Sequence, residues 1–341
     1  MLDDRHLRNM TDDIGMLQFS KLAQPDPKSG YTLDDNARAL MVAAFTSQGA
    51  DLAFKYARFM YGAQRPDGSW SNLLNNGRYY SHCNSEDSIG RALAACSASM
   101  WCSHPGVATL CEQMFNSNLP RSAHFRSPRA MAYTIIALCK CRHPERRDQF
   151  LRTRLVDNLI SLYKECCGAG WYWFENYLTY CNGIIPQALF AAYGLSSDKR
   201  IYKVAQESLN FLNGILFRNG HLDIIGNAGW YHRDGQIPLY DQQPVDAASI
   251  IFACHEAFQT VGIREYYNLA KLASQWYQGK NAQQAALLDN ESGGCYDALT
   301  ATGVNKNQGA EAVLSLLLST MLMQGQLEQK DDDDITLANL S

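Results

Sequence analysis

Six short segments of this chain share one pattern, in which a loop rich in Gly, Asn, aromatic or charged residues leads into a run of small and apolar residues. The segments are DDNARA (34–39), SIGRA (88–92), RSPRA (126–130), IIPQA (184–188), PVDAA (244–248) and QGAEA (308–312). Their closing alanines are 38 to 64 residues apart, with a mean of about 55. A loose helical repeat of this size predicts a closed ring of six helical hairpins.

Hydrophobic periodicity predicts about twelve helices, two in each repeat. Six runs, near 34–47, 86–101, 128–141, 183–194, 245–259 and 308–324, are apolar on nearly every side. A helix without a polar face must be covered all round, so these runs are predicted to form an inner ring. The predicted outer helices lie near 3–22, 50–63, 105–117, 148–165, 199–217 and 262–279. The expected fold class is all-α, an (α/α)6 toroid over residues 1–329, followed by an acidic, disordered tail at 330–341.

Local signals mark where the predicted inner helices begin. Proline in a first turn costs no hydrogen bond, and a short polar side chain can cap the first N–H groups. Strand signals are sparse and confined to short loop hairpins such as the one predicted at 220–235. The first-turn prolines are Pro128, Pro186 and Pro244, and the predicted caps are Asp34 or Asp35, Ser85 and Ser127.

Charge and composition narrow the classes of function. The net charge is −4, and residues 331–334 alone supply four negative charges. The sequence has no basic stripe, which argues against a nucleic-acid partner, and no apolar run near 20 residues that would predict a membrane span. The first residues lack the basic-then-apolar pattern of a secretory signal, and the eleven scattered cysteines suit a reduced compartment, so a cytoplasmic location is expected. The cysteine spacings do not match zinc sites, and neither a metal nor a cofactor is expected.

Acidic residues lie at or just before the predicted starts of the inner helices, which a ring of hairpins gathers at one mouth. They are Asp34, Asp35, Glu86, Asp87, Glu175, Asp246 and Glu311. Glycosidic cleavage needs two carboxyl groups, one of them an acid with a raised pKa. Ion pairing offers a structural alternative for Asp34 and Asp87, because each has an arginine four residues later. Asp35 and Glu86 are therefore favoured as the catalytic pair, with Asp87 as a substitute for Glu86.

Aromatic and basic residues accompany these carboxylates. Loop tryptophans Trp70, Trp171 and Trp173 are predicted to offer flat rings to a sugar, with the alternative that they fasten long loops to the ring. Arginines occupy one repeat position in three successive repeats, as Arg38, Arg91 and Arg129. They are predicted either to bind an anionic group or to form a buried ion-pair network that closes the ring.

The segments GYTLDDNARA (30–39), SEDSIGRA (85–92), SPRA (127–130) and WFENYLTYCNGIIPQAL (173–189) resemble a helical domain often found with glycosyltransferases. More broadly, the chain resembles the (α/α)6 toroid superfamily of carbohydrate-active proteins. The resemblance implies a fold and a carbohydrate substrate class but assigns no catalytic residue.

The expected function is therefore a glycoside hydrolase acting on an oligosaccharide, with Asp35 and Glu86 or Asp87 as the acid and base. Arg91, Arg129 and Glu175 are expected to bind hydroxyls or an anionic group, together with Asp34, Asp246, Glu311 and the three tryptophans. One alternative is a non-catalytic glycan-binding or partner module of a glycosyltransferase system. Another is a sugar epimerase or isomerase, which would use histidines for proton transfer, and His255 alone lies well inside a predicted inner helix.

Overall fold

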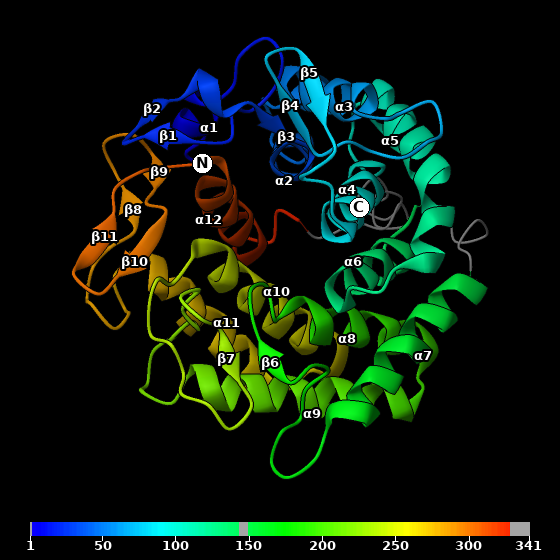
Figure 1. The fold of residues 1–341 in the computed structure, drawn as a ribbon, viewed down its shortest axis with the longest axis vertical. Helices are drawn as coiled ribbons and strands as arrows, with labels where there is room; N and C mark the ends of the chain where they lie inside the picture. Colours follow the sequence, from blue (N-terminus) through cyan, green and yellow to red (C-terminus); the bar gives the residue numbers. More distant parts are fainter. Residues whose placement is uncertain (1, 143–148, 328–341) are drawn as a thin grey trace, which may run out of the picture.

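The computed structural model describes residues 2–142 and 149–327, so the acidic tail expected at 330–341 lies outside the described residues. Inner and outer helices alternate along the chain and form two concentric rings (Figure 1). The inner ring consists of α2 (Leu33–Ala44), α4 (Glu86–Ser99), α6 (Pro128–Cys139), α8 (Ile184–Ser196), α10 (Pro244–Val261) and α12 (Ala310–Met323). Each inner helix packs against the next, and α12 packs against α2 to close the ring.

The outer ring follows the prediction except in the first repeat. Its helices are α1 (Arg5–Asn9), α3 (Ala50–Gly62), α5 (Pro105–Asn118), α7 (Gln149–Cys166), α9 (Lys199–Leu216) and α11 (Arg264–Ser274). The helix predicted at 3–22 is wrong beyond Asn9. The Asp12 side chain accepts from the backbone N–H groups of Ile14 and Gly15, an alternative to helical bonding that Asp readily offers. Two short strands, β1 (Ser20–Lys21) and β2 (Gln24–Pro25), complete the segment.

Short strands occupy the loops. A three-stranded antiparallel sheet joins β3 (Tyr31–Thr32), β4 (Leu73–Asn75) and β5 (Arg78–Tyr80). Further pairs are β8 (Leu288–Asp289) with β9 (Gly294–Cys295) and β10 (Ala298–Thr300) with β11 (Gly303–Asn305). The hairpin predicted at 220–235 is wrong, because β7 (Tyr231–His232) pairs with β6 (Tyr177–Leu178) of another loop.

Neighbouring inner helices approach each other closely where their residues are small. A Cβ placed on Gly90 of α4 would lie 2.9 Å from the carbonyl oxygen of Ala130 in α6. One placed on Gly183, just before α8, would lie 2.2 Å from the carbonyl oxygen of Ser249 in α10. Glycine is therefore needed for helix spacing at these two positions.

The N-terminal segment meets the segment that leads into α12 where the ring closes. His6 of α1 is buried, and its Nε2 lies 3.0 Å from the carbonyl oxygen of Gln308, just before α12. The Ala310 N–H donates to the carbonyl of Gln18, and the Leu22 N–H donates to the side chain of Asn307. The N-terminal segment therefore links the first and last repeats and closes the ring.

All eleven cysteines are free thiols. Within 2–142 and 149–327, no helix combines the length and apolar character needed to cross a membrane.

Candidate active site

A polar cavity of about 380 Å³ lies at the ends where inner helices α2, α10 and α12 begin. Loop residues complete its wall, among them the exposed ring of Phe19 and several side-chain amides. We call it the acidic cavity. Its carboxylates are Asp34, Asp35, Asp241, Asp297 and Glu311, and its amides are Gln18, Asn72, Asn227, Gln243 and Asn305.

The first turn of α2 fixes Asp35. The cap is Thr32 and neither Asp34 nor Asp35, contrary to prediction, because the Thr32 Oγ1 accepts from the Asp35 N–H at 3.0 Å. The same hydroxyl donates to Asp35 Oδ2 at 2.6 Å. Ser85 and Ser127 cap α4 and α6 as predicted.

Asp34 and Asp35 are adjacent carboxyl groups with opposite pKa shifts. Asp35 is only 4% exposed, and its burial raises its pKa to about 7 against the lowering effects of Arg38 and Thr32. Burial also acts to raise the pKa of Asp34, but the guanidinium groups of Arg91 and Arg38 outweigh it and hold that pKa below its ordinary value. Divergent pKa values in neighbouring acids are typical of acid/base sites.

Arginines of the inner helices pair with these carboxylates across helices. Arg38 contacts Asp35 at 3.3 Å and Glu311 of α12 at 2.9 Å, so one guanidinium bridges two acids of the cavity. Arg91 of α4 forms an ion pair with Asp34 of α2. The predicted pairs of Asp34 with Arg38 and of Asp87 with Arg91 are therefore wrong as direct bonds. We call Arg38 and Arg91, with Asp34, Asp35 and Glu311, the charged layer.

Arg129 and Glu175 form a separate buried cluster. The Arg129 guanidinium contacts Glu175 at 2.9 Å and donates to the Tyr180 carbonyl and the Thr179 hydroxyl. With a further bond to the Asn182 side chain, four hydrogen bonds hold the guanidinium within the fold. The structure thus gives all three repeated arginines carboxylate partners, in line with the ion-pair alternative.

Glu86 and Asp87 tie α4 to its neighbours. Glu86 Oε2 accepts from the backbone N–H groups of Arg126 and Ser127, both at 2.7 Å. Asp87 accepts from the hydroxyls of Ser127 and Tyr180, both at 2.5 Å. Neither residue lines the acidic cavity, so the structure does not bring them to Asp35.

Asp246 is buried in the first turn of α10. Its carboxylate accepts from the Cys181 N–H at 2.5 Å, and burial raises its pKa to about 7 despite that bond. Like Glu86, it joins two repeats and does not line the acidic cavity.

The three predicted tryptophans lie in the core. Trp70 donates from Nε1 to the Met60 carbonyl, and Trp171 donates to the Glu175 carbonyl. Trp173 packs edge-on against Phe174 with ring centroids 5.3 Å apart. All three rings are buried and none lines the acidic cavity, which is the arrangement expected of residues that fasten loops to the ring.

Sequence reasoning missed several cavity residues, among them two acids and one aromatic residue besides the amides. Asp241 and Asp297 lie in long loops that the repeat pattern does not cover, and burial raises the pKa of Asp297. Phe19, 56% exposed, was assigned to a helix that the structure replaces with a loop. The sequence offered one signal for these two acids, since Asp241 lies shortly before the fifth repeat segment and Asp297 before the sixth.

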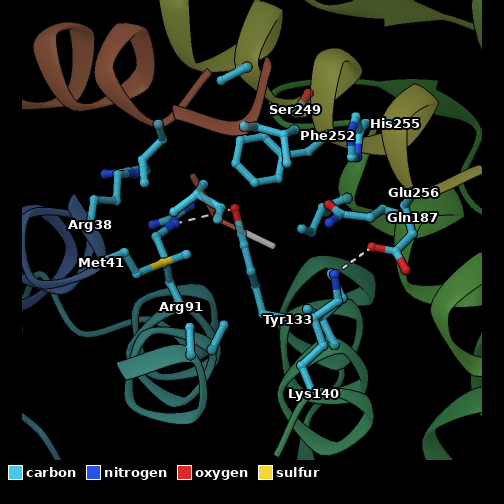
Figure 2. A pocket seen from close by; sticks show the side chains of 18 of the residues that line it. Arg38, Met41, Arg91, Tyr133, Lys140, Gln187, Ser249, Phe252, His255 and Glu256 are labelled. Atoms are coloured by element: carbon cyan, nitrogen blue, oxygen red, sulfur yellow. Dashed lines mark hydrogen bonds and ion pairs between the residues drawn. The ribbon is translucent and has the colours of Figure 1, made fainter. Parts of the chain in front are cut away.

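A second cavity, of about 470 Å³, runs along the inner helices, from Val245 near the start of α10 to Gln259 near its end (Figure 2). Its wall is mostly apolar, and we call it the apolar cavity. Arg38 and Arg91 line it, whereas their carboxylate partners line the acidic cavity, and the two cavities share no lining residue. The charged layer therefore separates them. His255, the one histidine predicted to lie well inside an inner helix, lines the apolar cavity.

Within the described ranges, no group of three or more His, Cys, Asp or Glu side chains is arranged to hold a metal ion.

No family model and no curated protein matches the sequence. Solved structures are similar along nearly the full chain. A sugar epimerase from a ruminal bacterium has a TM-score of 0.71 at 12% identity, over 95% of this chain and 97% of that one. Cellobiose 2-epimerase from Spirochaeta thermophila has a TM-score of 0.70 at 14% identity, over 96% of each chain. A family 76 α-mannanase from Bacteroides thetaiotaomicron has a TM-score of 0.60 at 13% identity, over 86% of each chain. The chain thus has the (α/α)6 toroid fold that these carbohydrate-active proteins share, as predicted.

Proposed function

We propose that this protein is a glycoside hydrolase whose active site is the acidic cavity. The observation that carries the proposal is the meeting of Asp35 and Glu311 across the single guanidinium of Arg38, inside a polar cavity at the mouth of the toroid. Hydrolysis of a glycoside by two carboxyl groups requires such a pair in one cavity. The fold shared with epimerases, an isomerase and glycoside hydrolases supports a carbohydrate substrate.

Asp35 is the general acid in this proposal. Its raised pKa keeps it protonated up to about pH 7, so it can give a proton to the oxygen of the leaving group. Glu311 is the general base that activates water. Its side chain is 45% exposed and reaches solvent, whereas Arg91 holds the other first-turn acid, Asp34. Glu311 thus replaces Glu86 and Asp87 as the partner of Asp35.

Phe19 and the amides supply binding contacts. The exposed ring of Phe19 can cover the C–H face of a sugar, a role that the buried Trp70, Trp171 and Trp173 cannot fill. The side-chain amides of the cavity can donate to and accept from sugar hydroxyls. We therefore expect Phe19→Ala to weaken substrate binding more than it lowers turnover.

The test is a screen of oligosaccharides by proton NMR, with wild type, Asp35→Asn and Glu311→Gln. Each substitution removes a proton-transfer group and is expected to lower turnover by at least about 100-fold. Glu86→Gln is the matched control, since Glu86 is an acid at an inner-helix start outside the cavity, and it should keep turnover within about threefold of wild type.

The appearance of new anomeric signals would show hydrolysis. The anomeric configuration of the product that forms first would show whether the reaction proceeds with retention or inversion. Loss of turnover in Glu86→Gln but not in Asp35→Asn would overturn the assignment. A substrate converted to an isomer without cleavage would show the epimerase alternative, and binding without any turnover would show the glycan-binding alternative. The association with a glycosyltransferase stays a prediction.

A further inference from the structure

The apolar cavity takes no part in the proposed hydrolysis, yet it is the larger of the two. Its volume is about 470 Å³, whereas an engineered cavity of about 150 Å³ is enough to bind benzene. Apolar side chains from four inner helices form its wall. They are Met41, Phe45, Ile136, Phe252, Leu318 and Leu322.

Two polar groups in the cavity have unused hydrogen-bonding capacity. Gln187 of α8 is only 5% exposed, and its Oε1 is buried without a hydrogen-bond partner in the described part of the chain. Figure 2 shows this side chain reaching from α8 toward the middle of the cavity. The Tyr133 hydroxyl accepts from Arg91 Nε at 3.3 Å and can still donate its own hydrogen. A buried polar group without a hydrogen bond raises the free energy of the protein, and a ligand that forms this bond removes that penalty.

The arginines, the lysine and the glutamate that line the cavity each have an ion-pair partner. Arg38 and Arg91 pair with carboxylates of the charged layer, and Lys140 pairs with Glu256 at 2.6 Å. A charged ligand would lose hydration without gaining an uncommitted partner. The cavity therefore favours a neutral molecule.

We propose that the apolar cavity is a second ligand site, for a neutral amphipathic molecule with an aromatic or aliphatic body and one hydroxyl or amide group that bonds Gln187. At about three times the volume that holds benzene, it has room for a bicyclic body. Gln259, near the carboxyl end of α10, lines the cavity and is exposed. The acidic cavity lies at the starts of α2, α10 and α12 and shares no lining residue with this site, so this ligand is distinct from the proposed substrate.

The test measures binding of 2-naphthol and 2-methylnaphthalene to the full-length protein by fluorescence titration. These probes have nearly the same shape, but only 2-naphthol forms hydrogen bonds. Gln187→Met keeps the side-chain length and removes the carboxamide. Wild type should bind both probes saturably, and Gln187→Met should lose about 5- to 10-fold in affinity for 2-naphthol but less than about twofold for 2-methylnaphthalene.

Filling the cavity locates the site. Ala94 and Ala98 line it from successive turns of α4, so Ala98→Phe places a ring in the space that the probe would occupy. Ala98→Phe should abolish binding of both probes, and Ala50→Phe on the exposed start of α3 is the matched control that should leave binding unchanged. Thermal melts check folding, and Ala94→Leu substitutes if Ala98→Phe does not fold.

Absence of saturable binding to wild type would overturn the proposal, as would equal binding to wild type and the cavity-filling variant. An equal loss of both probes in Gln187→Met would overturn the role of the carboxamide. Because the readout is binding and not turnover, failure of the hydrolase proposal would leave this result unchanged.

Discussion

Asp246 is a carboxyl group that the fold keeps protonated. Burial raises its pKa to about 7 in the folded protein, against an ordinary value of 3.8, so between these pH values the folded state holds a proton that the unfolded state has released. Stability therefore falls as pH rises from about 4 to about 7 and then levels off. Asp246→Asn removes this titration while its side-chain oxygen can still accept from Cys181.

We expect the melting temperature of Asp246→Asn to fall less than that of wild type between pH 4.5 and pH 7.5, by a margin of about 2 °C or more. Differential scanning calorimetry at both pH values measures the difference. Parallel curves for the two proteins would contradict the assigned proton.

Arg91 neutralises Asp34 between two helices. Removing the guanidinium in Arg91→Met leaves a partly buried carboxylate without its main partner, at a cost of about 2–3 kcal/mol in the free energy of unfolding at pH 7. Burial acts to raise the pKa of Asp34 and Arg91 is the largest lowering influence, so Asp34 has a higher pKa in Arg91→Met than in wild type. As the pH falls, Asp34 of the variant takes up a proton while Asp34 of the wild type is still ionised, which relieves the cost of the unpaired carboxylate. Urea titrations should thus show the difference in the free energy of unfolding between wild type and Arg91→Met narrowing as the pH falls from 7 toward the ordinary pKa of 3.8, and a constant difference would contradict this account.

At the scale of helices, the spacing of the inner ring depends on particular glycines. Gly90→Ala improves helix propensity, yet its new Cβ would lie 2.9 Å from the Ala130 carbonyl oxygen in the next helix. We expect a loss of about 1–3 kcal/mol in the free energy of unfolding. Gly214→Ala in α9 is the control, since its Cβ meets nothing within 4 Å, and it should gain about 0.5–1 kcal/mol. Denaturant titration measures the change in the free energy of unfolding for each variant. If both substitutions stabilised the protein, or both destabilised it, the argument from close helix approach would be wrong.

The inner helices could be predicted from the sequence because their evidence is local, as in the run AMAYTIIAL (130–138). The place of Asp35 at the start of an inner helix was likewise predictable from local signals. Its link to Glu311 through Arg38 was not, since Glu311 is 273 residues from Arg38 and no periodicity indicates which repeats face each other. The burial of Trp70 and Trp171 could not be predicted for a similar reason. A loop rich in aromatic residues looks the same in sequence whether its rings face solvent or pack into the core.

At the scale of the whole molecule, stability depends on closing the ring through His6. His6→Ala removes a buried ring and its bond to the Gln308 carbonyl, at an expected cost of about 2 kcal/mol. Hydrogen exchange should quicken in both α2 and α12, which pack together at the closure. His124→Ala at an exposed position is the control and should change stability by less than about 0.5 kcal/mol. Faster exchange confined to α1 would contradict a role of His6 in closing the ring.

The charged layer closes the inner end of the acidic cavity. A toroid open through its axis could let a polysaccharide pass from one face to the other and be cut repeatedly along its length. Here Arg38 and Arg91, with their carboxylates, block that route halfway. For the proposed hydrolase, a sugar chain therefore cannot thread through the ring, and the substrate and its fragments use the same opening.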